Sequence, residues 1–163
     1  MAALADTVYI SFYKGLGGVG GAAVAGPART IEALKVWRLR HGGTLYTAFP
    51  LAISALAGIE RQLPRMPLYL ERSRALAARI GAPAIVNPTT PHTNAFQLWI
   101  EGSPAELAER HRAFARAHGV WLFNNFMPSP LTSRSIAEIV VGDGSDGWTI
   151  DEAAGWIATF LAG

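Results

Sequence analysis

The architecture of this chain is set around Ser11-Phe12-Tyr13-Lys14-Gly15-Leu16-Gly17-Gly18, in which a lysine is followed at once by glycines. The residues before the lysine, 7–13, are β-branched and aromatic with alternating character, which predicts a strand. The glycines that follow predict a turn or loop, and residues 22–27 predict a short return strand that ends at a Gly-Pro pair. The lysine is therefore expected at the end of a strand, beside a slim backbone.

Helix signals dominate the chain from there to about residue 80. Helices are predicted over residues 27–40 and 45–63, the second with a kink at Pro50, because proline in a helix interior removes a hydrogen bond. A third helix is expected to end at Ile80, since Gly81 follows it and glycine favours helix ends.

The second half of the chain alternates strand and helix signals. Helix starts are predicted at Ser103, with Pro104 and Glu106 behind it, and at Thr149, with Glu152 behind it. Strands are predicted over residues 84–87, 94–100, 120–123 and 135–141. From residue 65 the order is thus helix, strand, strand, helix, strand, strand, helix. This order indicates a compact α/β sandwich, with a small mixed or antiparallel sheet and helices on one face.

Composition limits the classes of site that the chain can carry. It has no cysteine, which excludes disulfides, thiolate catalysis and zinc-thiolate sites. The formal charge is +2, the basic residues are dispersed and the four histidines are not paired, so neither a nucleic-acid surface nor a metal site is expected. The start lacks signal-peptide features and the apolar stretch 16–27 is too short to span a membrane, which makes a cytoplasmic protein the default.

The balance of apolar and charged residues is unusual. Apolar residues make up 50% of the chain and charged residues 16%, which is more apolar and less charged than an ordinary soluble domain. One explanation is apolar surface that a missing segment or a second subunit covers. The other is the high content of alanine and glycine, and composition does not decide between them.

The lysine segment matches three motifs. Residues 15–20 fit G-x-G-x-x-G after a strand, but no helix starts at the third glycine and no strand ending in an acid follows. Ser11-x-x-Lys14 fits a penicillin-binding signature whose S-D-N and K-T-G companions are missing. The third motif is a lysine that forms a Schiff base with a carbonyl cofactor, which needs a rigid element and a slim neighbouring backbone. From spacing alone, an exposed loop lysine beside a tight turn is an equal alternative to this last hypothesis.

Residues 11–22, followed by Gly-Pro and the stretch Trp-Arg-Leu-Arg-His-Gly-Gly-Thr at 37–44, resemble the threonine aldolase and β-eliminating lyase family of pyridoxal-phosphate enzymes. The similarity continues through residues 92–96 and 118–122, so it covers nearly the whole chain. Family members are much longer, and the resemblance implies that this chain corresponds to their C-terminal half.

The resemblance also implies a fold and a domain organisation. The expected class is α/β, comprising the end of a fold-type I large domain and a small C-terminal α/β domain. Residues 1–64 would be the remnant of the cofactor-binding large domain, with the lysine segment and connecting helices. Residues 65–163 would be the small domain.

The family's functional residues carry over to four positions. The resemblance implies that Lys14 binds pyridoxal phosphate covalently and that Ser11 lies near its phosphate, the latter by analogy with related aspartate-aminotransferase-fold enzymes. Arg40 and His41 match a segment that lines the active-site entrance, which implies contact with substrate. The implied reaction is retro-aldol cleavage or β-elimination of a β-substituted amino acid.

The implied partners are the amino-acid substrate and either a second copy of the chain or the missing N-terminal half, because family enzymes build their sites at dimer interfaces. An alternative from another class is a non-catalytic truncated chain, or an interaction module that retains the small-domain fold.

Overall fold

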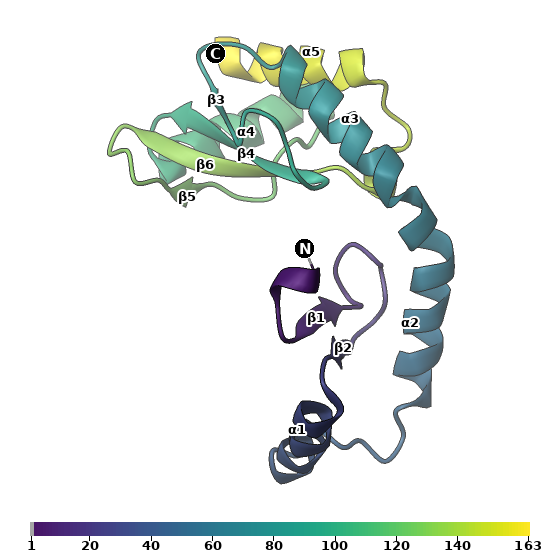
Figure 1. The fold of residues 1–163 in the computed structure, drawn as a ribbon. Coiled ribbons are helices and arrows are strands. Elements are labelled where there is room, and N and C mark those ends of the chain that lie inside the picture. The colour runs from purple at the N-terminus through teal and green to yellow at the C-terminus, as the bar shows by residue number, and fades with distance from the viewer. Residues whose placement is uncertain (1) are drawn as a thin grey trace. The chain divides into compact units, whose positions relative to one another are not determined.

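The computed structural model describes residues 2–163, which form two compact units (Figure 1). One unit ends at Arg65 and the other spans Met66–Gly163. That the first unit is the remnant of a larger domain stays a prediction. None of the helices in the described residues combines the length and the hydropathy needed to cross a bilayer.

The first unit contains a β-hairpin and two helices. After the short 3-10 helix η1 (Ala2–Leu4), β1 (Val8–Ser11) pairs antiparallel with β2 (Ala22–Ala25), which confirms the predicted strand and return strand. The helices are α1 (Ala28–Arg40) and α2 (Phe49–Gln62), and the 3-10 helix η2 (Leu63–Arg65) closes the unit.

Two details of the second helix were predicted wrongly. α2 begins at Phe49, four residues later than expected, and Pro50 therefore lies in its first turn rather than in its interior. The first N–H groups of a helix have no intrahelical acceptor, so proline is tolerated there and causes no kink.

The second unit is an antiparallel sheet packed against helices. Its sheet has four strands in the order β3-β4-β6-β5, with every neighbouring pair antiparallel. Its elements in chain order are α3 (Met66–Arg79), β3 (Ile85–Asn87), β4 (Ala95–Glu101), α4 (Pro104–His118), β5 (Met127–Pro128), β6 (Arg134–Val140), η3 (Asp143–Ser145) and α5 (Ile150–Ala162).

The predicted helix starts are confirmed by their hydrogen bonds. The Ser103 hydroxyl accepts from the Glu106 N–H at 3.3 Å, while a Glu106 carboxylate oxygen accepts from the Ser103 N–H at 2.9 Å. Thr149 and Glu152 form the same reciprocal pair at the start of α5. Each box satisfies N–H groups that the helix cannot satisfy itself.

The core of the second unit lies on one face of its sheet. Phe96, Leu98 and Ile100 alternate along β4 and are buried on the same face as Ala137 of β6. Side chains from all three long helices complete this core: Leu76, Ala77, Leu107, Phe114, Ile157 and Phe160. The helices therefore cover one face of the sheet, as the element order predicts (Figure 1).

The predicted strand at residues 120–123 does not form. The backbone N–H groups of Leu122 and Phe123 both donate to Nε2 of His111, at 3.0 and 3.3 Å. His111 is 2% exposed, and burial lowers the pKa of its imidazole, which keeps an acceptor nitrogen available. Because a side chain satisfies these two donors, the segment stays irregular, and only the two residues of β5 pair with β6.

Candidate functional site

Lys14 lies in the loop that joins β1 to β2, three residues after Ser11, the last residue of β1. The loop that carries it is closed by three backbone hydrogen bonds: Phe12 N–H to Gly21 O at 3.0 Å, Gly17 N–H to Lys14 O at 2.8 Å, and Gly18 N–H to Phe12 O at 2.7 Å. The lysine itself is exposed. The sequence predicts a strand as far as Tyr13, but the strand ends at Ser11, so Lys14 lies inside the glycine loop rather than at the strand end.

At two positions of this loop the backbone geometry requires glycine. Gly17 has φ +70°, a left-handed conformation that glycine adopts without the steric cost of a Cβ. A Cβ at Gly18 would lie 2.8 Å from the carbonyl oxygen of Phe12. The tight turn around Lys14 thus depends on residues without side chains.

Helix α2 holds the loop through one of its faces. Ser54 Oγ accepts a hydrogen bond from the Val19 N–H at 3.0 Å. One turn further along α2, a methyl group at Gly58 would collide with the carbonyl oxygen of Leu16, so helix and loop backbones are in direct contact there. Leu16 is 5% exposed and anchors the loop. The loop beside Lys14 is therefore fixed by tertiary contacts as well as by its own turn.

Hydroxyl groups gather beside the lysine. The Ser11 hydroxyl donates to Tyr9 Oη at 2.7 Å. This hydrogen bond, one with Tyr13 and the nearby Lys14 charge lower the pKa of the exposed Tyr9 phenol below its usual value. Sequence reasoning singled out Ser11 and Lys14 but missed Tyr9 and Tyr13. For Tyr9 the available signal was its spacing of two residues from Ser11 on the same strand, because such residues share a face.

The chemical groups around Lys14 match the functional groups of pyridoxal phosphate. An aldehyde requires a primary amine, and Lys14 supplies one that no ion pair occupies within the described residues. A phosphate requires hydrogen-bond donors, and the Ser11 and tyrosine hydroxyls could supply them. The assignment of Lys14 and Ser11 to cofactor binding remains a prediction.

Arg40 and His41 lie together at the C-terminal end of α1. The Arg40 guanidinium carbon stands 5.2 Å from the Trp37 ring centroid, and the His41 ring stacks on Trp37 at 5.7 Å. Across residues 2–163, no hydrogen bond, ion pair or ring contact joins either residue to Lys14. Their role in substrate binding stays a prediction.

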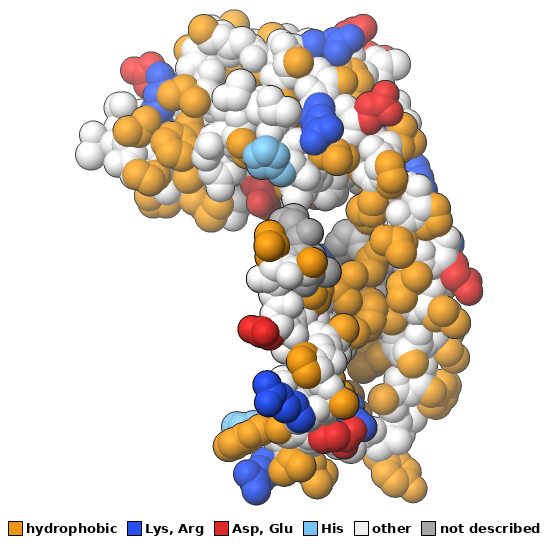
Figure 2. Space-filling model, in the orientation of Figure 1, with side chains coloured by type: hydrophobic (Ala, Val, Ile, Leu, Met, Phe, Trp, Pro, Cys, Tyr) orange, Lys and Arg blue, Asp and Glu red, His pale blue; other side chains and the backbone are white. Residues whose placement is uncertain are grey.

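The first unit exposes much of its apolar surface. No residue of α1 is buried, although the helix carries Leu34, Val36, Trp37 and Leu39. Hydrophobic side chains also gather along α2 (Figure 2), where Phe49 and Ile53 are more than half exposed. Large exposed side chains favour the first explanation of the composition, apolar surface that another segment covers, over alanine and glycine content alone.

Comparison with known proteins gives a structural match but no sequence-family match. No family model and no curated protein sequence matches the chain. A crystal structure from Exiguobacterium sp. 255-15, provisionally assigned as an aromatic amino acid beta-eliminating lyase/threonine aldolase, is similar over 99% of this chain, with 31% identity and a TM-score of 0.87. A second, from Listeria monocytogenes EGD-E and provisionally assigned as an L-allo-threonine aldolase, is similar over 98% of it, with 28% identity and a TM-score of 0.85.

The chain spans less than half of the length of these solved structures, 46% of the first and 44% of the second. Its fold is therefore shared with part of threonine aldolase-like lyases. This agrees with the resemblance that the lysine segment carries, and with the expectation of a partial chain.

Proposed function

We propose that this chain is the lysine-bearing part of a pyridoxal-phosphate-dependent lyase of amino-acid metabolism, similar to threonine aldolase. The reaction would be retro-aldol cleavage or β-elimination of a β-substituted amino acid. One observation carries the proposal: nearly the whole chain shares the fold of two threonine aldolase-like structures. Within this fold, Lys14 lies in a hydrogen-bonded glycine loop that follows β1.

In this proposal Lys14 Nζ holds the cofactor's aldehyde carbon, and the Ser11 hydroxyl contacts its phosphate. When bound, pyridoxal phosphate supplies an electron sink for negative charge that develops at the substrate's α-carbon. The contacts of the loop with Ser54 and Gly58 fix the backbone beside Lys14, which limits the positions that the amine can take. For Ser11 to donate to the phosphate, its proton would turn away from Tyr9 Oη, and the Tyr9 hydroxyl would then donate to Ser11 Oγ, which lies 2.7 Å away.

Arg40 and His41 would bind the substrate, with the guanidinium suited to a carboxylate. Because no described interaction connects them to Lys14 of the same chain, we propose that a second copy or an N-terminal half completes the site. The exposed apolar surface of α1 and α2 supports such a partner.

The chain offers a matched control for the cofactor test, since it contains only two lysines, Lys14 and Lys35. Lys35 is exposed on α1 and paired with Glu32 at 2.6 Å. The protein is incubated with pyridoxal phosphate, reduced with borohydride, and digested for mass spectrometry. We expect the pyridoxyl group on Lys14 in the unchanged protein and in Lys35→Ala, and its loss in Lys14→Ala.

Equal labelling of both lysines would contradict the proposal, because it would show ordinary surface reactivity. That result favours the alternative, a non-catalytic chain that retains the fold. With Lys14-specific labelling, threonine and allo-threonine are the first substrates to test, with glycine release as the readout.

A further inference from the structure

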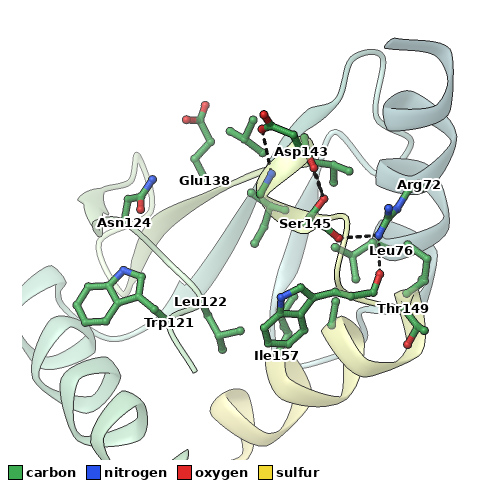
Figure 3. Close-up of a pocket in the computed structure, with 18 of the residues that line it drawn as sticks. Arg72, Leu76, Trp121, Leu122, Asn124, Glu138, Asp143, Ser145, Thr149 and Ile157 are labelled. Carbon is green, nitrogen blue, oxygen red and sulfur yellow. Dashed lines mark hydrogen bonds between the residues drawn. The ribbon is translucent and has the colours of Figure 1, made fainter. Parts of the chain in front are cut away.

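A cavity of about 620 Å³ lies within the second unit, away from any residue assigned above (Figure 3). The end of β6 and the irregular segment 121–125 line it on two sides, and α5 lines it on a third. The lining residues that matter below are Leu122, Glu138, Val140 and Ile157. Pockets of this size commonly hold ligands.

One wall of this cavity is an open strand edge. The Val141 N–H donates to Asn94 O at 2.8 Å, so in β6 the odd-numbered residues direct their backbone groups toward β4. Glu138 and Val140 therefore direct theirs to the opposite edge. There β5 pairs only with Ser135 and Ile136, and no other backbone hydrogen bond in residues 2–163 reaches Glu138 or Val140.

The edge is open because the adjacent segment is held elsewhere. Continuing the β5–β6 register would bring residues 122–125 opposite 138–141. Instead, His111 Nε2 accepts the N–H groups of Leu122 and Phe123, and Phe123 is buried in the core. The resulting space is bounded on one side by the backbone N–H and C=O groups of Glu138 and Val140. On the helix-covered face of the sheet it is bounded by apolar side chains such as Leu122 and Ile157.

We propose that this open edge and cavity bind an extended peptide segment, which adds to β6 as a further strand. Added strands gain affinity from main-chain hydrogen bonds and specificity from alternate side chains. A strand edge with unpaired N–H and C=O groups can form these hydrogen bonds with another chain. Here the available groups are those of Glu138 and Val140.

The faces of the sheet define the chemistry of the peptide. A residue opposite Glu138 shares the face of that exposed carboxylate, which no ion pair neutralises in the described part of the chain, so a lysine or arginine fits there. Its two neighbours point to the helix-covered face, where Leu122 and Ile157 line the cavity (Figure 3), so apolar side chains fit there. The ligand is a peptide in which apolar and basic residues alternate.

The probe for this proposal is a short fluorescein-labelled peptide in which valine and lysine alternate, titrated with the full chain at neutral pH by fluorescence anisotropy. Hydrogen exchange is read at single amides in the same complex. We expect the peptide to slow exchange at Glu138 and Val140, whose amides are open without it, and to leave Ile139 and Val141 unchanged. A fully N-methylated version of the peptide should not bind, because it lacks backbone donors.

Charge is tested with variants at two strand carboxylates. Glu138→Gln should weaken binding roughly two- to fivefold, the worth of an exposed ion pair. Glu101→Gln, at the exposed end of β4 and outside the cavity, should leave it unchanged. A peptide alternating valine and glutamate should bind more weakly than the lysine peptide.

Four results would overturn the proposal. They are no binding, binding without slower exchange at Glu138 and Val140, equal affinity for the lysine and glutamate peptides, and unchanged affinity after N-methylation. A further result would also overturn it: exchange at these two amides that is already slow without peptide and becomes slower as the protein concentration rises. A second copy of the chain would then cover the edge.

Discussion

His111 shows how one side chain decides a local conformation. It is buried among aromatic rings, with the Trp121 ring 4.6 Å and the Phe123 ring 5.5 Å away, and burial lowers the pKa of its imidazole. The neutral ring accepts two backbone N–H groups, which a protonated Nε2 could not do. The irregular segment beside the cavity therefore depends on the protonation state of one residue.

This dependence predicts acid sensitivity. In the unfolded chain the His111 pKa returns to its ordinary value of 6.5, so the unfolded state binds more protons than the folded state just below that pH. Above pH 6.5 His111 contributes its full stabilisation to the folded state. Below pH 6.5 the free energy of unfolding decreases as the pH falls. His111→Gln, whose amide oxygen also accepts hydrogen bonds, should flatten this slope in chemical denaturation series.

The matched control is His92→Gln, at an exposed histidine, which should keep the slope. An unchanged slope in His111→Gln would show that other groups cause it. His111→Ala should lower the free energy of unfolding by about 2 kcal/mol at neutral pH, because one buried and one part-buried N–H group lose their acceptor.

At the scale of elements, the lysine loop and α2 act as one piece. The loop rests on the helix where Gly58 allows backbone contact with Leu16, and Ser54 adds a hydrogen bond. Neither residue carries a sequence signal for this contact, since a glycine inside a helix ordinarily lowers helix stability. The position of Lys14 therefore depends on a residue far away in the chain.

Gly58→Ala tests this contact. Alanine favours the helix by about 1 kcal/mol, but its methyl group collides with the Leu16 carbonyl, and overpacking typically costs 1–3 kcal/mol. We expect net destabilisation of the first unit and weaker Lys14-specific labelling by pyridoxal phosphate. Gly155→Ala, in α5 with no atom within 4 Å of the new Cβ, should instead stabilise the chain by roughly 0.5–1 kcal/mol. Loss of stability in both variants would refute the explanation.

For the molecule as a whole, the two units differ in how they cover their apolar side chains. The second unit has a contiguous core between sheet and helices. In the first unit, α1 has no buried residue and both strands of its hairpin are largely exposed. Apolar side chains left in water favour association, by roughly 25 cal/mol per Å² removed from solvent.

We therefore predict that the chain self-associates through its first unit. Leu39→Glu on α1 and Leu56→Glu on α2, both more than half exposed, should reduce association measured by light scattering without lowering the unfolding temperature. Leu131→Glu, an exposed leucine of the second unit, is the control and should change nothing. Equal effects of all three variants would point to net charge rather than to this surface.

Much of this architecture follows from residues that are adjacent in the chain. The capping boxes at Ser103 and Thr149 involve side chains three residues apart, and the hairpin around Lys14 follows from a β-branched run before glycines. The lysine segment also indicated the family whose solved structures share the fold. These features are formed by residues close together in the chain, so they can be predicted from the sequence alone.

Contacts between distant residues decided the rest. Residues 120–123 have strand character, but His111, about ten positions earlier, accepts their N–H groups and prevents pairing with β6. The docking of the Lys14 loop on Gly58 and the open edge at Glu138 likewise exist only in the folded chain. Hydrogen-bond donors pair with whichever acceptor packing brings near, and local propensity contains no information about that acceptor.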